Sequence, residues 1–233
     1  MIIRAGRVAR GLFLANAGLT LASTAGQAAR YFRGFNYALG LIPALDLNRE
    51  WNIPSWYSSG LLLLSAILLA LIAAEAWQAR RPDAAHWSGL AIVLSLLSID
   101  EAVAIHEAWS VPLRQLLGVT GGPLYYAWVI PAMMSVLLVA LLYWRFFSAL
   151  PKATKRRFLL AAALYVGGAV GIELFEGCYI SRMGTNETFT YALMVSAEEL
   201  LEMCGVVVLI HGLLCYLGGR LGGTVRIVEG TQD

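Results

Sequence analysis

Acidic side chains occur inside apolar stretches of this sequence. Nine of its fifteen acidic residues lie in runs long enough to span a membrane: Glu75, Asp100, Glu101, Glu107, Glu173, Glu176, Glu198, Glu199 and Glu202. An ionised side chain at the bilayer centre costs about 2.5 to 3.5 kcal/mol even on a lenient scale, so such residues normally face a bundle interior and mark a functional path. No lysine or arginine lies in 87–109, 158–176 or 191–217. Protons or a bound cation must therefore neutralise the eight carboxyls of these three runs.

Together with His106, these carboxyls offer the donor atoms of a metal site. An oxygen-rich set with an imidazole suits iron, manganese or zinc better than copper. Helix bundles build di-metal sites from inward carboxylates and Glu-x-x-His pairs, whereas Glu173-x-x-Glu176 and Glu199-x-x-Glu202 keep that spacing without histidine. We therefore predict a divalent metal site. Its expected ligands are Asp100, Glu101, His106, Glu173, Glu198 and Glu199, and the expected catalytic residues are Glu202 and Glu107.

Helical geometry predicts how these groups face one another. At about 100° per residue, Asp100 and Glu107 share one face of their helix, while His106 falls on a different side from Asp100. The three acids of the last run span an arc of about 100°, so the two stripes can face each other. Glu107 and Glu176 lie near span ends, where solvation is the alternative to ligation.

The elements that must position these residues are transmembrane helices. The chain has 233 residues, 59% hydrophobic and 14% charged, with a mean hydropathy of +0.68, which is outside the usual soluble range. A bilayer span needs about 20 apolar residues. We predict an all-α bundle of six transmembrane helices forming a single domain, residues 1–233, with spans at 11–29, 56–77, 87–109, 124–147, 158–176 and 191–217.

The first span is the weakest of the six. Three arginines precede its modest apolar run, and residues 25–29 resemble a small-residue cleavage site, so a removed signal peptide is the alternative. We favour a retained helix because the run lacks a strong leucine core. Six spans then place twelve of the seventeen lysines and arginines on the side of the termini, which predicts that both termini are cytoplasmic.

Other features bear on architecture. Ser98-x-Asp-Glu101 and Ser196-x-Glu-Glu199 are similar at an offset of 98 residues, which favours a 3+3 inverted repeat of the kind found in transporters. Ala163, Gly167 and Gly171 form a track of small residues that predicts close helix contact.

Segments 33–55 and 110–123 are longer than turns require and are expected to form a lid or interfacial pieces. A net charge of +2 gives no indication of nucleic-acid binding.

Three stretches carry a resemblance to a family. Residues 52–59, the Ser98-x-Asp-Glu-x4-His-Glu107 motif and Glu198-Glu-Leu-Leu-Glu202 resemble an uncharacterised group of bacterial multi-pass membrane proteins. This resemblance implies the bacterial cytoplasmic (inner) membrane. A more distant similarity is to ceramidase-like membrane hydrolases, which combine intramembrane Ser, Asp and His around a metal; this chain has Ser98 and Asp100 but no His-x-x-x-His pair and one helix fewer.

Function follows from the metal hypothesis. The lipid bilayer is the expected surroundings, and a lipid or another hydrophobic molecule entering laterally is the expected substrate, hydrolysed at zinc or oxidised at iron. Two other classes stay open at this stage. One is a cation- or proton-coupled transporter that loads ions on the same carboxyls. The other is an accessory or assembly subunit whose buried acids contact the basic residues of a partner.

Overall fold

The computed structural model describes residues 2–220 and 226–228, and the chain there is mainly helical. The helices longer than two turns are α1 (Ala5–Arg33), α3 (Ile53–Gln78), α4 (Ala84–Val103), α5 (Ile105–Leu116), α6 (Val129–Ala149), α7 (Lys152–Val166), α8 (Glu173–Met183) and α9 (Phe189–Gly218). Shorter elements are η1 (Ala38–Gly40), α2 (Leu41–Leu45), η2 (Gly122–Leu124) and the π-helix η3 (Gly167–Ile172). Strands β1 (Ile2–Arg4) and β2 (Arg226–Val228) pair in parallel. The predicted all-helical fold is confirmed, apart from this short strand pair.

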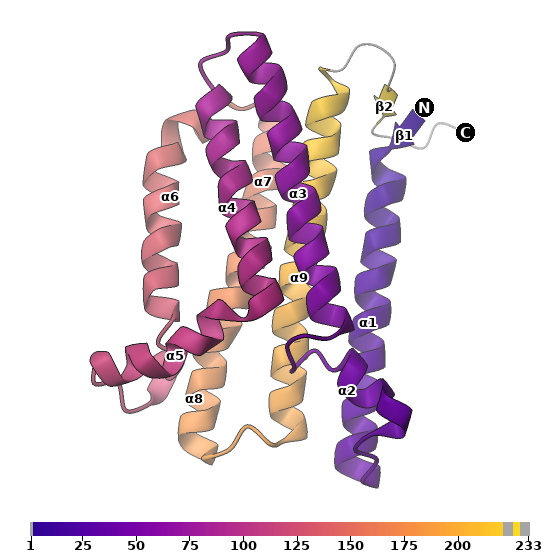
Figure 1. Ribbon diagram of the computed structural model, residues 1–233, viewed down its shortest axis with the longest axis vertical. Coiled ribbons are helices and arrows are strands. Elements are labelled where there is room, and N and C mark those ends of the chain that lie inside the picture. The colour runs from indigo at the N-terminus through magenta and orange to yellow at the C-terminus, as the bar shows by residue number, and fades with distance from the viewer. Residues whose placement is uncertain (1, 221–225, 229–233) are drawn as a thin grey trace.

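Five helical segments of the described chain are long and apolar enough to cross a membrane: α3, α4, α6, the continuous Lys152–Met183 segment and α9. They match five predicted spans within a few residues, except that the fifth is longer because α7, η3 and α8 form one rod. The predicted third span is wrong at its end. The chain leaves the bundle axis after α4, and α5 runs obliquely past the end of α6, while α8 and α9 continue beyond it (Figure 1).

Local sequence explains where the spans begin. Asn52 caps α3 by accepting a hydrogen bond from the backbone N–H of Ser55 at 3.2 Å, and Pro54 occupies the first turn. Thr188 caps α9 through the backbone N–H of Tyr191 at 3.1 Å. Helix α1 ends at Gly34, which adopts the left-handed conformation (φ 72°) common at helix C-termini.

Helix α9 lies at the centre and contacts α1, α3 and α7, whereas α6 lies at the periphery (Figure 1). Toward the end where α1 begins and α9 ends, Trp87 is fully buried, with its ring 4.8 Å from that of Phe146 and 4.9 Å from that of Tyr216. At the same end Arg81 pairs with Glu75 at 2.8 Å. Glu75 thus has a local basic partner in Arg81.

The predicted track of small residues is wrong in register. A Cβ built on Gly167 or Gly171 would meet no atom within 4 Å, whereas one on Gly168 would lie 2.8 Å from the Glu198 carbonyl oxygen. All three glycines belong to the π-helix, a local irregularity that a helical wheel of about 100° per residue does not represent. Gly168 is therefore the residue that lets this helix approach α9.

Candidate metal centre

A break between α4 and α5 determines where His106 lies. Ala104 adopts a left-handed conformation (φ 54°, ψ 47°), which costs a non-glycine residue about 1 to 3 kcal/mol. The turn brings His106 back to the end of α4, where its backbone N–H donates to Asp100 Oδ1 at 2.9 Å. Its Nδ1 lies 2.8 Å from Asp100 Oδ2. The prediction that His106 lies away from Asp100 is wrong, because it assumed one continuous helix.

Asp100 fixes both the orientation and the tautomer of the His106 ring. With Nδ1–H donated to the carboxylate, the Nε2 lone pair is the one available for a ligand, which is the arrangement of most metal-binding histidines. The ring also packs on Trp128, with centroids 4.7 Å apart. Desolvation by burial lowers the pKa of His106, but the hydrogen bond and charge of Asp100, with Glu173 and Glu107, outweigh it and raise the pKa to about 9.

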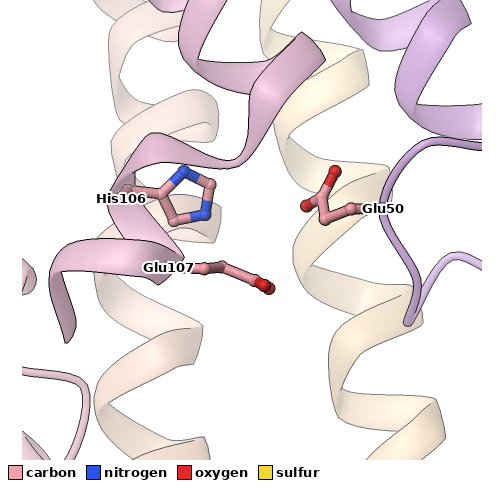
Figure 2. A group of neighbouring side chains, drawn as sticks. All are labelled: Glu50, His106 and Glu107. Atoms are coloured by element: carbon pink, nitrogen blue, oxygen red, sulfur yellow. The ribbon is translucent and has the colours of Figure 1, made fainter. Parts of the chain in front are cut away.

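His106, Glu107 and Glu50 form a group that we call the Glu-His-Glu triad. One ligand atom from each lies within 4.8 Å of the other two. Figure 2 shows Glu107 and His106 on one side and Glu50 on the other, with the carboxylates directed toward the space between them. Three ligands around a tetrahedral metal at about 2.1 Å lie about 3.4 Å apart. Binding an ion would therefore need only a small contraction of side chains.

Glu50 is held in place by the segment that links α2 to α3. Asp46 in this segment is buried and accepts hydrogen bonds from Gln27 of α1 and from the Asn48 backbone N–H. Asn52 closes the segment by donating to the Asp46 carbonyl at 2.7 Å. These bonds tie the segment to α1 and to the start of α3.

One carboxylate oxygen of Glu50 lacks a partner. Its Oε2 is buried and has no hydrogen-bond partner among the described residues. Burial, followed by the nearby charge of Glu107, raises the pKa of Glu50. Buried polar atoms are almost always satisfied, so an unpartnered oxygen on a carboxylate of the triad favours a cation at this site.

Deeper in the bundle, the other acids form a connected network behind the triad. Glu198 lies within hydrogen-bonding reach of both Glu173 and Glu176, and Glu173 also accepts from Trp128 Nε1 at 2.9 Å. Nearer the triad, Glu101 contacts Ser58 and has Glu50 and His106 as charged neighbours. Glu199 and Glu202 both have Glu101 as a neighbour, and Glu202 also contacts Tyr165.

The structure thus brings the predicted residues into one region but divides them. His106, a predicted ligand, and Glu107, predicted to be catalytic, belong to the triad, with Asp100 behind the imidazole. The remaining acids belong to the network: Glu101, Glu173, Glu176, Glu198, Glu199 and Glu202. Glu176 is 2% exposed and so is not solvated, whereas Glu107 is exposed.

Sequence reasoning missed Glu50. It lies in a polar loop, outside every apolar run, so the argument from acids within spans could not select it. The signal that does exist is its place on the same side of the predicted membrane as Glu107, three residues before the start of α3.

The fold and site define a helical bundle compatible with a membrane, with a Glu-His-Glu group where α5 leaves the bundle axis. A family model described as a domain of unknown function, DUF8692, matches residues 11–217, so the chain belongs to that family. No curated protein and no solved structure matches the chain.

Proposed function

We propose that the Glu-His-Glu triad binds a divalent metal ion, namely iron, manganese or zinc. The observation that carries this proposal is the convergence of one ligand atom each from His106, Glu50 and Glu107 within 4.8 Å. Asp100 holds the other ring nitrogen of His106, and one buried oxygen of Glu50 has no partner among the described residues. One imidazole and two carboxylates suit these three metals. Three protein ligands also leave coordination positions open, as catalytic sites do.

The proposed activity is a metal-dependent reaction on a lipid or another hydrophobic molecule. A bound ion would supply Lewis acidity for hydrolysis, or redox chemistry if it were iron. The protein's own contribution would be orientation by Asp100 and proton storage in the network behind the triad, where Glu202 lies against Tyr165. The Ser98 hydroxyl donates to the Ser59 carbonyl at 2.9 Å, and the Ser59 hydroxyl donates to the Ser98 carbonyl at 2.8 Å. Because these bonds join α3 to α4, we assign Ser98 a role in packing and not the role of the serine in ceramidase-like hydrolases.

The same proposal includes a topology. The chain would form one transmembrane domain over 1–233, with six spans and both termini in the cytoplasm of a bacterium. Residues 1, 221–225 and 229–233 of this domain lie outside the described residues. The packing of α1 supports a retained first span, which brings the total to six. Its Asn16 is fully buried and accepts from the Tyr57 hydroxyl at 2.8 Å, and its Ser23 accepts from the Leu47 N–H at 3.0 Å.

Cysteine labelling in intact cells tests the topology. In a background without the native cysteines, Leu39→Cys should react with a membrane-impermeant maleimide, because Leu39 is 96% exposed at the end where α5 lies. Arg80→Cys, between α3 and α4 at the opposite end, should react only after lysis. The reverse pattern would reject the proposed orientation.

Elemental analysis of the detergent-purified chain tests the metal centre. We expect close to one equivalent of a divalent metal in the wild type and a strong loss in His106→Ala and Glu50→Gln. Glu187→Gln is the matched control, because Glu187 is an exposed carboxylate paired with Arg30 at 2.5 Å and away from the triad. Equal metal content in all four proteins would refute the proposal.

A cation- or proton-coupled transporter is the second candidate, and one observation favours it. The carboxyl network continues from the triad into the bundle as far as Glu176 and Glu198, beside the π-helix. The proposed 3+3 inverted repeat belongs with this alternative. Ion- or pH-dependent uptake into proteoliposomes that is lost in Glu198→Gln would favour transport, while turnover of a lipid without flux would favour the enzyme.

A further inference from the structure

A hollow of about 530 Å³ adjoins the triad. Its lining comes from η1, α2, the following segment and the first turn of α3, and includes Tyr37, Pro43, Arg49, Glu50, Trp51 and Trp56. Glu50 is shared with the triad, so the hollow and the metal centre are neighbours. We call it the Arg49 hollow.

Its lining is amphipathic. The side chains of Trp51 and Trp56 are both 78% exposed, and the neighbouring Leu39 and Leu41 are also exposed. Indole rings in such positions lie at the headgroup level of a membrane. This apolar rim would be costly in water, so it is suited to contact with lipid.

Arg49 gives the hollow a guanidinium group that can bind phosphate. Its Nε lies 3.3 Å from a carboxylate oxygen of the buried Asp46, and the side chain is 56% exposed. Because the ion pair uses Nε, the two terminal nitrogens of Arg49 remain available as hydrogen-bond donors. A guanidinium binds phosphate through two parallel hydrogen bonds, which an ammonium cannot do.

We propose that the Arg49 hollow binds the phosphate group of a phospholipid from the outer leaflet, with Trp51 and Trp56 against its glycerol and upper acyl chains. This inference rests on the proposed function, because it names the substrate class that would lie beside the triad. The guanidinium donors of Arg49 account for the phosphate, and the exposed indoles account for a lipid rather than a soluble phosphate. Glu50 belongs both to the lining of the hollow and to the triad, so the bound phosphate would lie next to the metal centre.

Native mass spectrometry of the detergent-purified chain tests this inference. The probes are dioleoylphosphatidylglycerol, dioleoylglycerol with the same chains, and glycerol phosphate. We expect saturable binding of the first only, weakened about tenfold or more in Arg49→Gln. Arg33→Gln is the matched control, because Arg33 is an exposed arginine at the same end, outside the hollow. This variant should bind the lipid as the wild type does.

Three results would overturn the proposal. Equal weakening in Arg49→Gln and Arg33→Gln would mean general attraction of anionic lipid. Equal binding of dioleoylglycerol would mean an apolar surface without phosphate recognition, and equal binding of glycerol phosphate would mean a site for soluble phosphates. If Arg49→Gln does not fold, Trp51→Ala replaces it, and unchanged lipid affinity in that variant would likewise overturn the proposal.

Metal content measured on the same samples separates this inference from the proposed function. Lipid binding is recorded with chelator present, so it does not depend on the ion. If Arg49→Gln retains its metal, the metal centre stands whatever that variant does to lipid binding. The lipid measurements then decide only the phospholipid proposal. Absence of metal in the wild type would reject the centre, whatever the lipid result.

Discussion

Replacing Asp100 by Asn should switch the tautomer of His106 and thereby lower the metal affinity of the triad. The asparagine oxygen can still accept from the His106 backbone N–H, but its amide would then donate to Nδ1. The imidazole would carry its proton on Nε2 and lose the lone pair that faces Glu50 and Glu107. Loss of such a supporting carboxylate typically costs about 10 to 100-fold in metal affinity.

The same substitution should change how stability depends on pH in the metal-free protein. The pKa of His106 rises from an ordinary value of 6.5 to about 9, which corresponds to about 3 kcal/mol of stability. The folded state holds the proton more tightly, so this stability is fully present below pH 6.5 and is lost as pH rises through 9. Asp100 is the first of the partners that raise this pKa, so Asp100→Asn should remove about 2 kcal/mol of it.

Unfolding in detergent with chelator from pH 6 to 9.5 measures this effect, and competition with a chelator of known affinity measures metal binding. The raised pKa of Glu50 also lowers stability as pH increases, and Asp100 is the last of the groups that shift it. The difference between wild type and Asp100→Asn therefore reports mainly on His106, to which Asp100 is hydrogen-bonded. Parallel pH curves together with equal metal affinity would refute the assigned role of Asp100.

Three further predictions concern packing and metal linkage. Gly205→Ala should lower the free energy of unfolding by about 1 to 3 kcal/mol, because its Cβ would lie 2.7 Å from the Tyr165 backbone N. Gly171→Ala should be tolerated, because a Cβ there meets no atom within 4 Å. Thermal unfolding in detergent that ranks the two variants the other way would contradict the α7–α9 packing. Asn16→Ala and Tyr57→Phe should be coupled by about 1 kcal/mol in a double-mutant cycle, and strictly additive effects would show that α1 does not depend on this hydrogen bond. Adding the preferred ion at about 100 times its dissociation constant should stabilise the wild type by about 3 kcal/mol, with apparent affinity increasing with pH as protons compete less; identical melting with chelator and metal at every pH would argue against the triad.

The sequence alone predicted five of the membrane-crossing helices and the presence of embedded acids. Hydropathy acts residue by residue, so 20 apolar positions in a row indicate a membrane-crossing helix whatever its neighbours are. The same local reasoning marked Glu198 and Glu202 as costly residues that need compensation, and both are buried in the described bundle. Fold class and the approximate region of the site were therefore predictable.

Only the tertiary structure decided which side chains meet. Ala104 carries no glycine or proline signal, and its left-handed conformation is compensated by the hydrogen bonds that Asp100 makes with His106, which a helical wheel does not represent. Glu50 reaches the triad from a loop more than 50 residues earlier, held there by Asp46 and Asn52. Long-range contacts of this kind depend on how loops close against helices, and residue type and spacing along one element contain no information about them.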